Sequence, residues 1–281
     1  MIKTATQVKA KIRNMSGGDS TKAQTLLRNY MMERFLERCS ISKYRNHFIL
    51  KGGMFVASYV GLDTRATMDI DTTVQALPLT LEKASEIIQE IIDVQLEDGV
   101  SFEIVSSKEI MEEHEYAGLR FMLDSYLGQI RQAIKIDIST GDAITPAAIK
   151  YSYPLMFEDR AISILSYNLE TVLGEKMETI LSRAEANTRM RDFYDIYILL
   201  NEKRNDIQNA ILKMAFDATC RKRNSTALTV QAPEILAGVK ESDVLKRHWD
   251  NYSMNNYYVG KLEWNDVFSK TEELAKMIQI I

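Results

Sequence analysis

The sequence has 281 residues, 46% of them hydrophobic, so it is long enough to bury a substantial core and to form two domains. Its formal net charge of −4 argues against a uniformly basic nucleic-acid-binding protein. The two cysteines, Cys39 and Cys220, are far apart and lack a Cys-x-x-Cys spacing, so the sequence indicates neither a zinc motif nor a disulfide framework.

Hydrophobic periodicity predicts an α+β protein with a mainly helical C-terminal half. The first forty residues have helical patterns, residues 45–165 mix strands and helices, and the remainder is mostly helical. Pro154 and the polar turn that follows it indicate a boundary, so we predict domains at residues 1–160 and 161–281. Since no apolar stretch has the length of a transmembrane helix and no signal-peptide apolar region is visible, we expect a cytoplasmic protein without a membrane partner.

The first candidate for function is a glycine turn. Residues 47–50 form a short apolar run typical of a strand, and residues 54–62 have a helix-like mix of apolar residues. Gly52 and Gly53 therefore lie at a predicted strand-to-helix turn. Glycine turns of this kind can bind phosphate through their backbone amides.

Two candidate strands carry carboxylates. Asp69 and Asp71 are two residues apart, and residues 134–139 alternate three isoleucines with polar residues that include Asp137. If the strands are neighbours in one sheet, the three carboxylates converge on its polar face, where a cation such as Mg²⁺ or Mn²⁺ offsets their repulsion. Taken singly, each strand is better explained as an amphipathic strand with its polar face in water.

Residues 168–200 predict two helices joined by a polar stretch. Lys176 falls within the buried stripe of the first helix, so its amine needs an anionic partner or must reach the rim of the core. Pairing with a protein carboxylate is one interpretation, and binding of a nucleotide's phosphates is the other.

The second of these helices brings two carboxylates together. Asp192 and Asp195 are three residues apart on one helix face, and ion pairing of Asp195 with Arg191 explains the pattern adequately. Arg183 belongs to a group of three arginines within nine residues. These arginines could bind phosphate, although a solvated helix face is the simpler interpretation.

Taken in order, these motifs resemble the AbiEii/AbiGii family of nucleotidyltransferase-like toxins. The segments that carry the resemblance are residues 51–53, 65–71, 175–183 and 191–195, with residues 135–137 at the place where such folds supply another acidic strand residue. The resemblance implies a DNA polymerase β-like nucleotidyltransferase core with a mixed sheet, followed by a helical domain that completes the active site. It also implies a toxin of a type IV toxin-antitoxin or abortive-infection system, neutralised by a separately encoded antitoxin.

The same resemblance gives roles to individual residues. Asp69 and Asp71 match the family's metal-binding pair, and Lys176 matches a lysine proposed for nucleotide binding. The further positions that it assigns to the nucleotide are Gly52, Gly53, Arg65, Thr67, Arg183, Asp192 and Asp195. One departure is that many nucleotidyltransferases have Gly-Ser at the turn, so a serine contact to phosphate has to be replaced here by backbone amides.

The implied reaction is transfer of a nucleoside monophosphate from an NTP to an acceptor hydroxyl, with RNA such as tRNA as the expected acceptor and Mg²⁺ or Mn²⁺ as cofactor. The catalytic candidates are Asp69, Asp71, Asp137 and Lys176, with Asp137 acting as a metal ligand or as a base. Two alternatives stay open. One is an antibiotic-type nucleotidyltransferase that modifies a small molecule, and the other is an NTP-binding interaction module without transfer activity.

Overall fold

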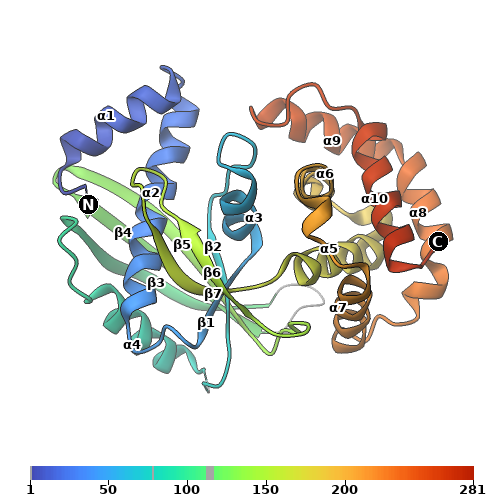
Figure 1. Cartoon of the computed structure of the whole chain (residues 1–281), viewed down its shortest axis with the longest axis horizontal. Helices are drawn as coiled ribbons and strands as arrows, with labels where there is room; N and C mark the ends of the chain where they lie inside the picture. The colour runs from blue at the N-terminus through green and yellow to red at the C-terminus, as the bar shows by residue number, and fades with distance from the viewer. Residues whose placement is uncertain (1, 78, 112–116) are drawn as a thin grey trace. The chain divides into compact units, whose positions relative to one another are not determined.

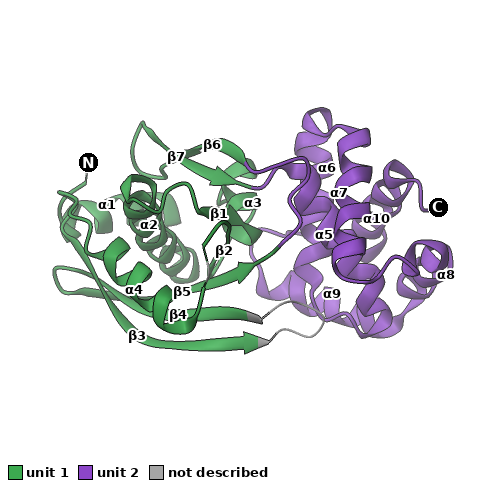
Figure 2. Ribbon diagram, turned by 90° about the horizontal axis from the view of Figure 1, so that it is seen from below, with its two compact units in different colours: residues 1–141, 149–166 green, residues 142–148, 167–281 purple. Residues whose placement is uncertain are grey.

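The computed structural model describes residues 2–77, 79–111 and 117–281. Two compact units make up the chain (Figure 2). Unit 1 consists of Met1–Gly141 and Ile149–Ser166, and unit 2 consists of Asp142–Ala148 and Tyr167–Ile281. The domain boundary that we predict after residue 160 stays a prediction.

Unit 1 is built on a mixed sheet whose described strands number seven, in the order β3-β4-β5-β2-β1-β7-β6 (Figure 1). The strands are β1 (Phe48–Lys51), β2 (Ile70–Val74), β3 (Val100–Met111), β4 (Ala117–Leu127), β5 (Ile130–Thr140), β6 (Ile149–Pro154) and β7 (Ala161–Ser166). The helices of this unit are α1 (Ala5–Ser16), α2 (Ser20–Ile41), α3 (Gly52–Val60) and α4 (Leu81–Ile92). The α+β fold class is confirmed.

Strand pairing in unit 1 confirms the neighbour relation on which the carboxylate hypothesis depends. β2 runs parallel to β5 and antiparallel to β1. Along β5 the isoleucines at 134, 136 and 138 are buried and the residues between them are half-buried, because successive side chains of a strand point to opposite faces. Lys135 and Asp137 therefore lie on the face opposite to the isoleucines.

β3 and β4 form a long antiparallel pair. Both strands are 11 or 12 residues long, and their register shifts between Ile104 and Ser106. A bulge of this kind breaks the strict alternation of polar and apolar residues.

Helices α2 and α4 pack on the sheet, α2 against β5 and β7 and α4 against β3 (Figure 1). The inner face of α4 is aliphatic, with Ile87, Ile88 and Ile91 fully buried. By contrast, α2 also brings charged residues into the core.

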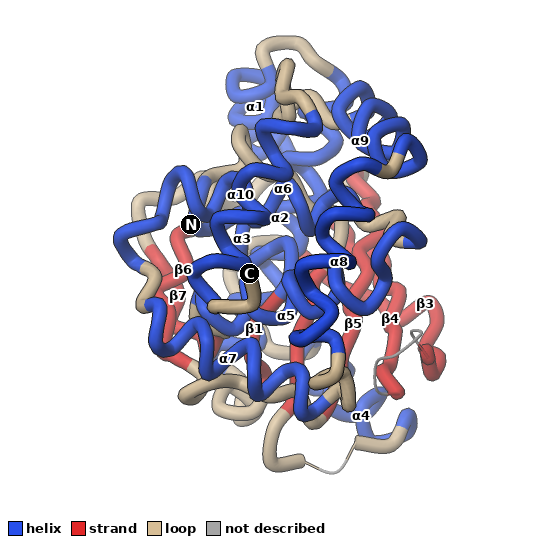
Figure 3. Tube along the Cα trace, turned by 90° about the vertical axis from the view of Figure 1, so that its right-hand side faces the viewer, coloured by secondary structure: helices blue, strands red, loops and turns tan. Residues whose placement is uncertain are grey.

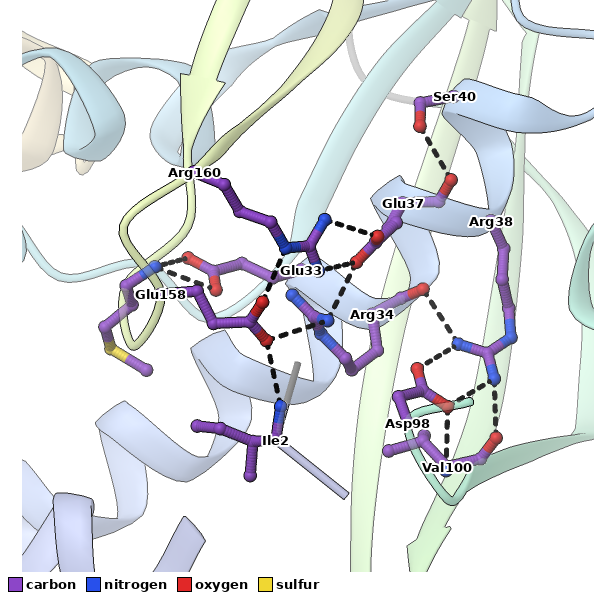
Figure 4. Close-up of polar contacts among 11 residues, drawn as sticks. Ile2, Glu33, Arg34, Glu37, Arg38, Ser40, Asp98, Val100, Glu158 and Arg160 are labelled. Carbon is purple, nitrogen blue, oxygen red and sulfur yellow. Dashed lines mark hydrogen bonds and ion pairs between the residues drawn. The ribbon is translucent and has the colours of Figure 1, made fainter. Parts of the chain in front are cut away.

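A buried network of ion pairs joins α2 to the rest of unit 1 (Figure 4). Arg38 donates to Asp98 through two nitrogens, at 2.7 and 2.9 Å. Glu37 accepts from Arg160, and both oxygens of Glu33 accept from the backbone amide of Met156. The connection between β6 and β7 is thus fixed to α2 by the Arg160–Glu37 ion pair and by the hydrogen bonds of Met156 to Glu33.

The described elements of unit 2 are all helices (Figure 3). They are α5 (Leu169–Arg183), α6 (Met190–Lys203), α7 (Asn209–Lys222), α8 (Leu228–Glu241), α9 (Asp243–Asn255) and α10 (Trp264–Ile278), with short 3₁₀ turns at Ala184–Ala186 and Arg204–Asp206. α6 packs on α10 through Phe193, whose ring contacts Trp264 edge to face. Aromatic and aliphatic side chains thus form the core of this unit.

Within residues 2–77, 79–111 and 117–281, no helix combines the length and the apolar character that crossing a membrane requires.

Candidate active site

Three carboxylates converge on adjacent strands of unit 1. Asp71 on β2 lies directly opposite Asp137 on the parallel strand β5, and Asp69 immediately precedes β2. Each of the three residues offers a carboxylate oxygen, and these oxygens all lie within 4.8 Å of one another. The strand register therefore produces the convergence that the sequence allows only as a hypothesis.

The glycine turn lies against this cluster. β1 ends at Lys51, which pairs with Asp71, and α3 begins at the next residue, Gly52. Gly52 has a φ of +66°, a conformation that favours glycine. A Cβ atom at Gly52 would lie 2.8 Å from the Cβ of Asp71 and still closer to its Oδ2. Only glycine fits both the backbone conformation and the space next to Asp71.

The second glycine contacts the segment that leads into β2. A Cβ atom at Gly53 would lie 2.7 Å from Thr67 Oγ1 and 3.1 Å from an Arg65 Nη2 atom. Thr67 is buried, and its hydroxyl donates to the backbone oxygen of Asp69 at 3.3 Å. Arg65 is also buried, and its guanidinium donates to the backbone oxygen of Ala66. These contacts fix the approach of the chain to the first carboxylate.

Cationic side chains contact the carboxylates from two strands. Arg120 on β4 donates to both oxygens of Asp137, at 2.7 and 2.8 Å. Lys135 on β5 places its amine 2.7 Å from Asp69 Oδ2 and 3.5 Å from Asp137 Oδ2. The repulsion among the three carboxylates is offset by these ion pairs.

The electrostatics of the cluster are visible in two pKa shifts. Partial burial by itself lowers the pKa of Lys135, but its hydrogen bond to Asp69 and the charges of Asp69 and Asp137 outweigh burial, so the pKa is raised. For Arg28, burial lowers the pKa, and the nearby charge of Asp69 opposes this effect only in part. Asp69 thus interacts with cations on both α2 and β5.

The donor set fits a divalent metal ion. Carboxylate oxygens are the ligands that Mg²⁺ and Mn²⁺ prefer, and three of them come together here from two strands. The absence of a side chain at Gly52 lets the turn pack directly against the Asp71 carboxylate. Asp69, Asp71 and Asp137 are therefore suited to hold such an ion.

A second cluster of candidate residues lies within unit 2. The amine of Lys176 on α5 lies 2.8 Å from Asp192 Oδ1 and 2.7 Å from Asp195 Oδ2, both on α6. Burial by itself raises the pKa of Asp192, but the charges of Lys176 and Arg189 lower it more, so the net shift is downward. The anionic partners that the sequence requires for Lys176 are thus these two aspartates.

The structure brings most of the predicted residues of unit 1 together, and it adds residues that sequence reasoning missed. Arg183 is the last residue of α5, about two turns beyond Lys176. Arg120 and Arg28 were not among the sequence candidates. Arg120 is the one polar residue among residues 119–123, and no sequence signal shows that Asp137 is its neighbour.

Comparison with known proteins yields a matching family and several solved structures. A family model described as "Nucleotidyl transferase AbiEii toxin, Type IV TA system" matches residues 34–270. A Helicobacter pylori structure assigned as a nucleotidyltransferase is 12% identical with a TM-score of 0.50, covering 91% of this chain and 96% of its own. The structure of JHP933 from Helicobacter pylori is 14% identical with a TM-score of 0.51, covering 91% of this chain and 94% of its own. At these identities the two structures support the fold alone, and no curated protein matches the sequence.

Proposed function

The chain belongs to the AbiEii family of nucleotidyl transferase toxins of type IV toxin-antitoxin systems, and we propose that it transfers a nucleoside monophosphate from an NTP to RNA. The acceptor that we propose is a hydroxyl of an RNA such as tRNA, and the reaction releases pyrophosphate. A separately encoded antitoxin neutralises the toxin in this proposal, as part of an abortive-infection response. A cytoplasmic location follows from the proposed substrates, since NTPs and tRNA are found there.

The observation that carries the proposal is the position of the carboxylates next to the glycine turn. Asp71 on β2 and Asp137 on β5 are opposite each other on parallel strands, Asp69 precedes β2, and the Gly52 backbone packs directly against Asp71. Phosphoryl transfer requires mainly positioning and electrostatic stabilisation, and this arrangement can provide both. It supports a transferase better than a solvated sheet face, since these acidic residues are buried or half-buried.

Asp69, Asp71 and Asp137 would hold the divalent metal ion. When bound, Mg²⁺ or Mn²⁺ lowers the pKa of an attacking hydroxyl and neutralises charge on the triphosphate. Arg120 donates to both oxygens of Asp137 and orients this carboxylate, and each oxygen keeps a second lone pair, so we assign Asp137 to metal ligation rather than to proton abstraction.

The remaining candidates are assigned to the nucleotide. The backbone amides at Gly52 and Gly53 bind phosphate at the start of α3, where a helix N-terminus favours an anion. Arg65 and Thr67 support this turn from behind. In unit 2, we assign Lys176 to the triphosphate as a positive charge, and Asp192 and Asp195 fix its position. Arg183 is a further cation in this assignment.

The test compares Asp69→Asn and Asp137→Asn with the wild-type chain and with Asp124→Asn. Asp124 is a matched control because it is also a buried aspartate of this sheet with an arginine partner, but it lies opposite Ala133, away from the three carboxylates. Each chain is expressed from a tight inducible promoter for growth, and each purified chain is incubated with α-labelled NTPs, a divalent metal and total tRNA. Circular dichroism verifies that every variant is folded.

We expect growth arrest and labelled tRNA with the wild type and with Asp124→Asn, and neither with the other two variants. Label that appears only on small hydroxyl compounds would instead favour the antibiotic-type transferase. Binding of NTP without label on any acceptor would favour the interaction module. Equal activity of all four chains would mean that the carboxylates have no part in transfer.

A further inference from the structure

The positions of the cations at the carboxylates lead to an inference that rests on the proposed function. Lys135 and Arg120 occupy carboxylate oxygens that a divalent metal ion needs as ligands. Arg28 adds a third positive charge that interacts with Asp69. A metal ion that enters alone therefore meets carboxylates whose charge is already offset by the protein.

Lys135 is the most direct competitor of the metal ion. Its amine is 2.7 Å from Asp69 and 3.5 Å from Asp137, so it lies between two of the three proposed metal ligands. A divalent ion bound to the same two carboxylates would repel the ammonium group at this distance. Since the Lys135 side chain is 29% exposed, it has room to move away from Asp69.

Arg120 has a different position. Its guanidinium binds both oxygens of Asp137 in a fork that fixes the plane of that carboxylate. Arg120 thus orients one ligand, whereas Lys135 links two. The amine of a lysine, on its flexible stem, is also better suited to change partners than a bidentate guanidinium.

We propose that Lys135 is the internal counter-ion of the carboxylates and makes metal binding depend on the triphosphate. Before substrate binds, the Lys135 amine keeps Asp69 and Asp137 together. A triphosphate brings negative charge that compensates the incoming metal ion and accepts the displaced ammonium group. Lys135 is in this sense a positioning residue that favours entry of the metal ion together with the nucleotide.

The experiment measures Mn²⁺ affinity by electron paramagnetic resonance, first with Mn²⁺ alone and then with a preformed complex of Mn²⁺ and inorganic triphosphate. Lys135→Met removes the charge and keeps much of the side-chain length, whereas Lys135→Arg keeps the charge. Lys108→Met is the matched control, because Lys108 is exposed on β3 opposite Arg120 and its loss changes the net charge equally.

We expect Lys135→Met to bind Mn²⁺ alone about tenfold more tightly than the wild type does, because the ammonium group that pairs with Asp69 and Asp137 is gone. Lys108→Met should change the affinity by less than about twofold, since its charge acts from a distance through solvent. Lys135→Arg keeps the positive charge, so it should bind Mn²⁺ alone no more tightly than the wild type does. The preference for the Mn²⁺–triphosphate complex over Mn²⁺ alone should shrink in Lys135→Met.

A thermal melt provides a second measurement if Lys135→Met is less stable. Without metal this variant should melt at a lower temperature than the wild type, and Mn²⁺ alone should raise its melting temperature more than that of the wild type. Equal Mn²⁺ affinities for Lys135→Met and the wild type would overturn the proposal, as would weaker binding by the variant.

The readouts separate this inference from the proposed function. If Lys135→Met binds Mn²⁺ more tightly but the wild-type chain labels no acceptor, the counter-ion proposal is upheld and the transferase proposal is rejected. Nucleotide transfer with unchanged Mn²⁺ affinity would uphold the transferase and reject the counter-ion.

Discussion

Replacement of Gly52 by alanine tests the geometry of the glycine turn most directly. Gly52 combines a φ of +66° with direct contact to Asp71. Alanine at this position adds two separate costs, one from the backbone conformation and one from the contact of the new methyl group. A second glycine of the same unit allows the two to be measured apart.

The backbone cost is about 1 kcal/mol for a non-glycine residue in the left-handed region. The contact adds about 1–3 kcal/mol, the usual cost of overpacking. Rotation of the Asp71 carboxylate does not relieve the contact, because the Cβ of Asp71 itself would be 2.8 Å from the new atom. The backbones of β1 and β2 must therefore move apart, and a shift of about 1 Å at Asp71 should lower transfer about 100-fold.

The control is Gly17→Ala, at the end of α1. Gly17 has a φ of +59°, and a Cβ atom built there would meet no atom within 4 Å. Urea denaturation of both variants measures the free energy of unfolding, and labelled NTP transfer measures activity. We expect Gly17→Ala to lose about 1 kcal/mol and keep its activity, and Gly52→Ala to lose about 2–4 kcal/mol together with most of its activity.

The reasoning would be refuted if Gly52→Ala were as stable and as active as Gly17→Ala. A Gly52→Ala variant that lost stability but kept full transfer would also contradict it, since the strain would then not reach Asp71.

Three further predictions concern buried groups away from this turn. Lys176→Met leaves the fully buried Asp195 without its ammonium partner and should lower the free energy of unfolding by about 3–5 kcal/mol in urea denaturation. Adding Asp195→Asn should recover part of this loss. A loss below about 1 kcal/mol would show that the pair is unimportant for stability. Burial raises the pKa of Glu33 to about 8. Between about pH 5 and 8 the folded chain therefore keeps a proton that the unfolded chain has released. The free energy of unfolding should fall by about 1.4 kcal/mol per pH unit as the pH rises through this range. Melting temperatures across this range should depend less on pH in Glu33→Gln, and an unchanged dependence would contradict the assignment. Gly174→Ala should lower the free energy of unfolding by about 1–3 kcal/mol in urea denaturation, because its Cβ would lie 2.9 Å from the backbone nitrogen of Phe216. A gain in stability, which is usual when alanine replaces glycine inside a helix, would show that α5 and α7 can separate.

The sequence is sufficient where local pattern determines the structure. The strand and helix predicted on either side of the glycine turn correspond to β1 (Phe48–Lys51) and α3 (Gly52–Val60), with the helix starting two residues earlier than expected. Both depend on hydrophobic periodicity and on glycine conformation within a dozen residues. The same holds for α5 and α6, which the apolar stripes and the polar stretch between them predict.

The sequence is insufficient where register determines the structure. Arg120 and Asp137 are neighbours only because β4 and β5 pair in one register, and a shift by one residue would move Arg120 to the other face of the sheet. Nothing in the spacing of 17 residues along the chain specifies that register. For the same reason, periodicity indicates that Asp71 and Asp137 each lie on the polar face of a strand. It does not indicate that the two strands pair and place both aspartates on the same face of one sheet.

Lys176 shows how one ion-pair cluster can serve both the fold and the candidate site. Its position in a buried stripe requires an anionic partner, and Asp192 and Asp195 provide two. Two protein carboxylates satisfy the amine without any nucleotide, yet they also fix its position before a substrate arrives, as electrostatic stabilisation of a transition state requires. The fold needs the ion pair in either case, so loss of activity in Lys176→Met has no clear meaning unless the unfolding free energy is measured on the same sample.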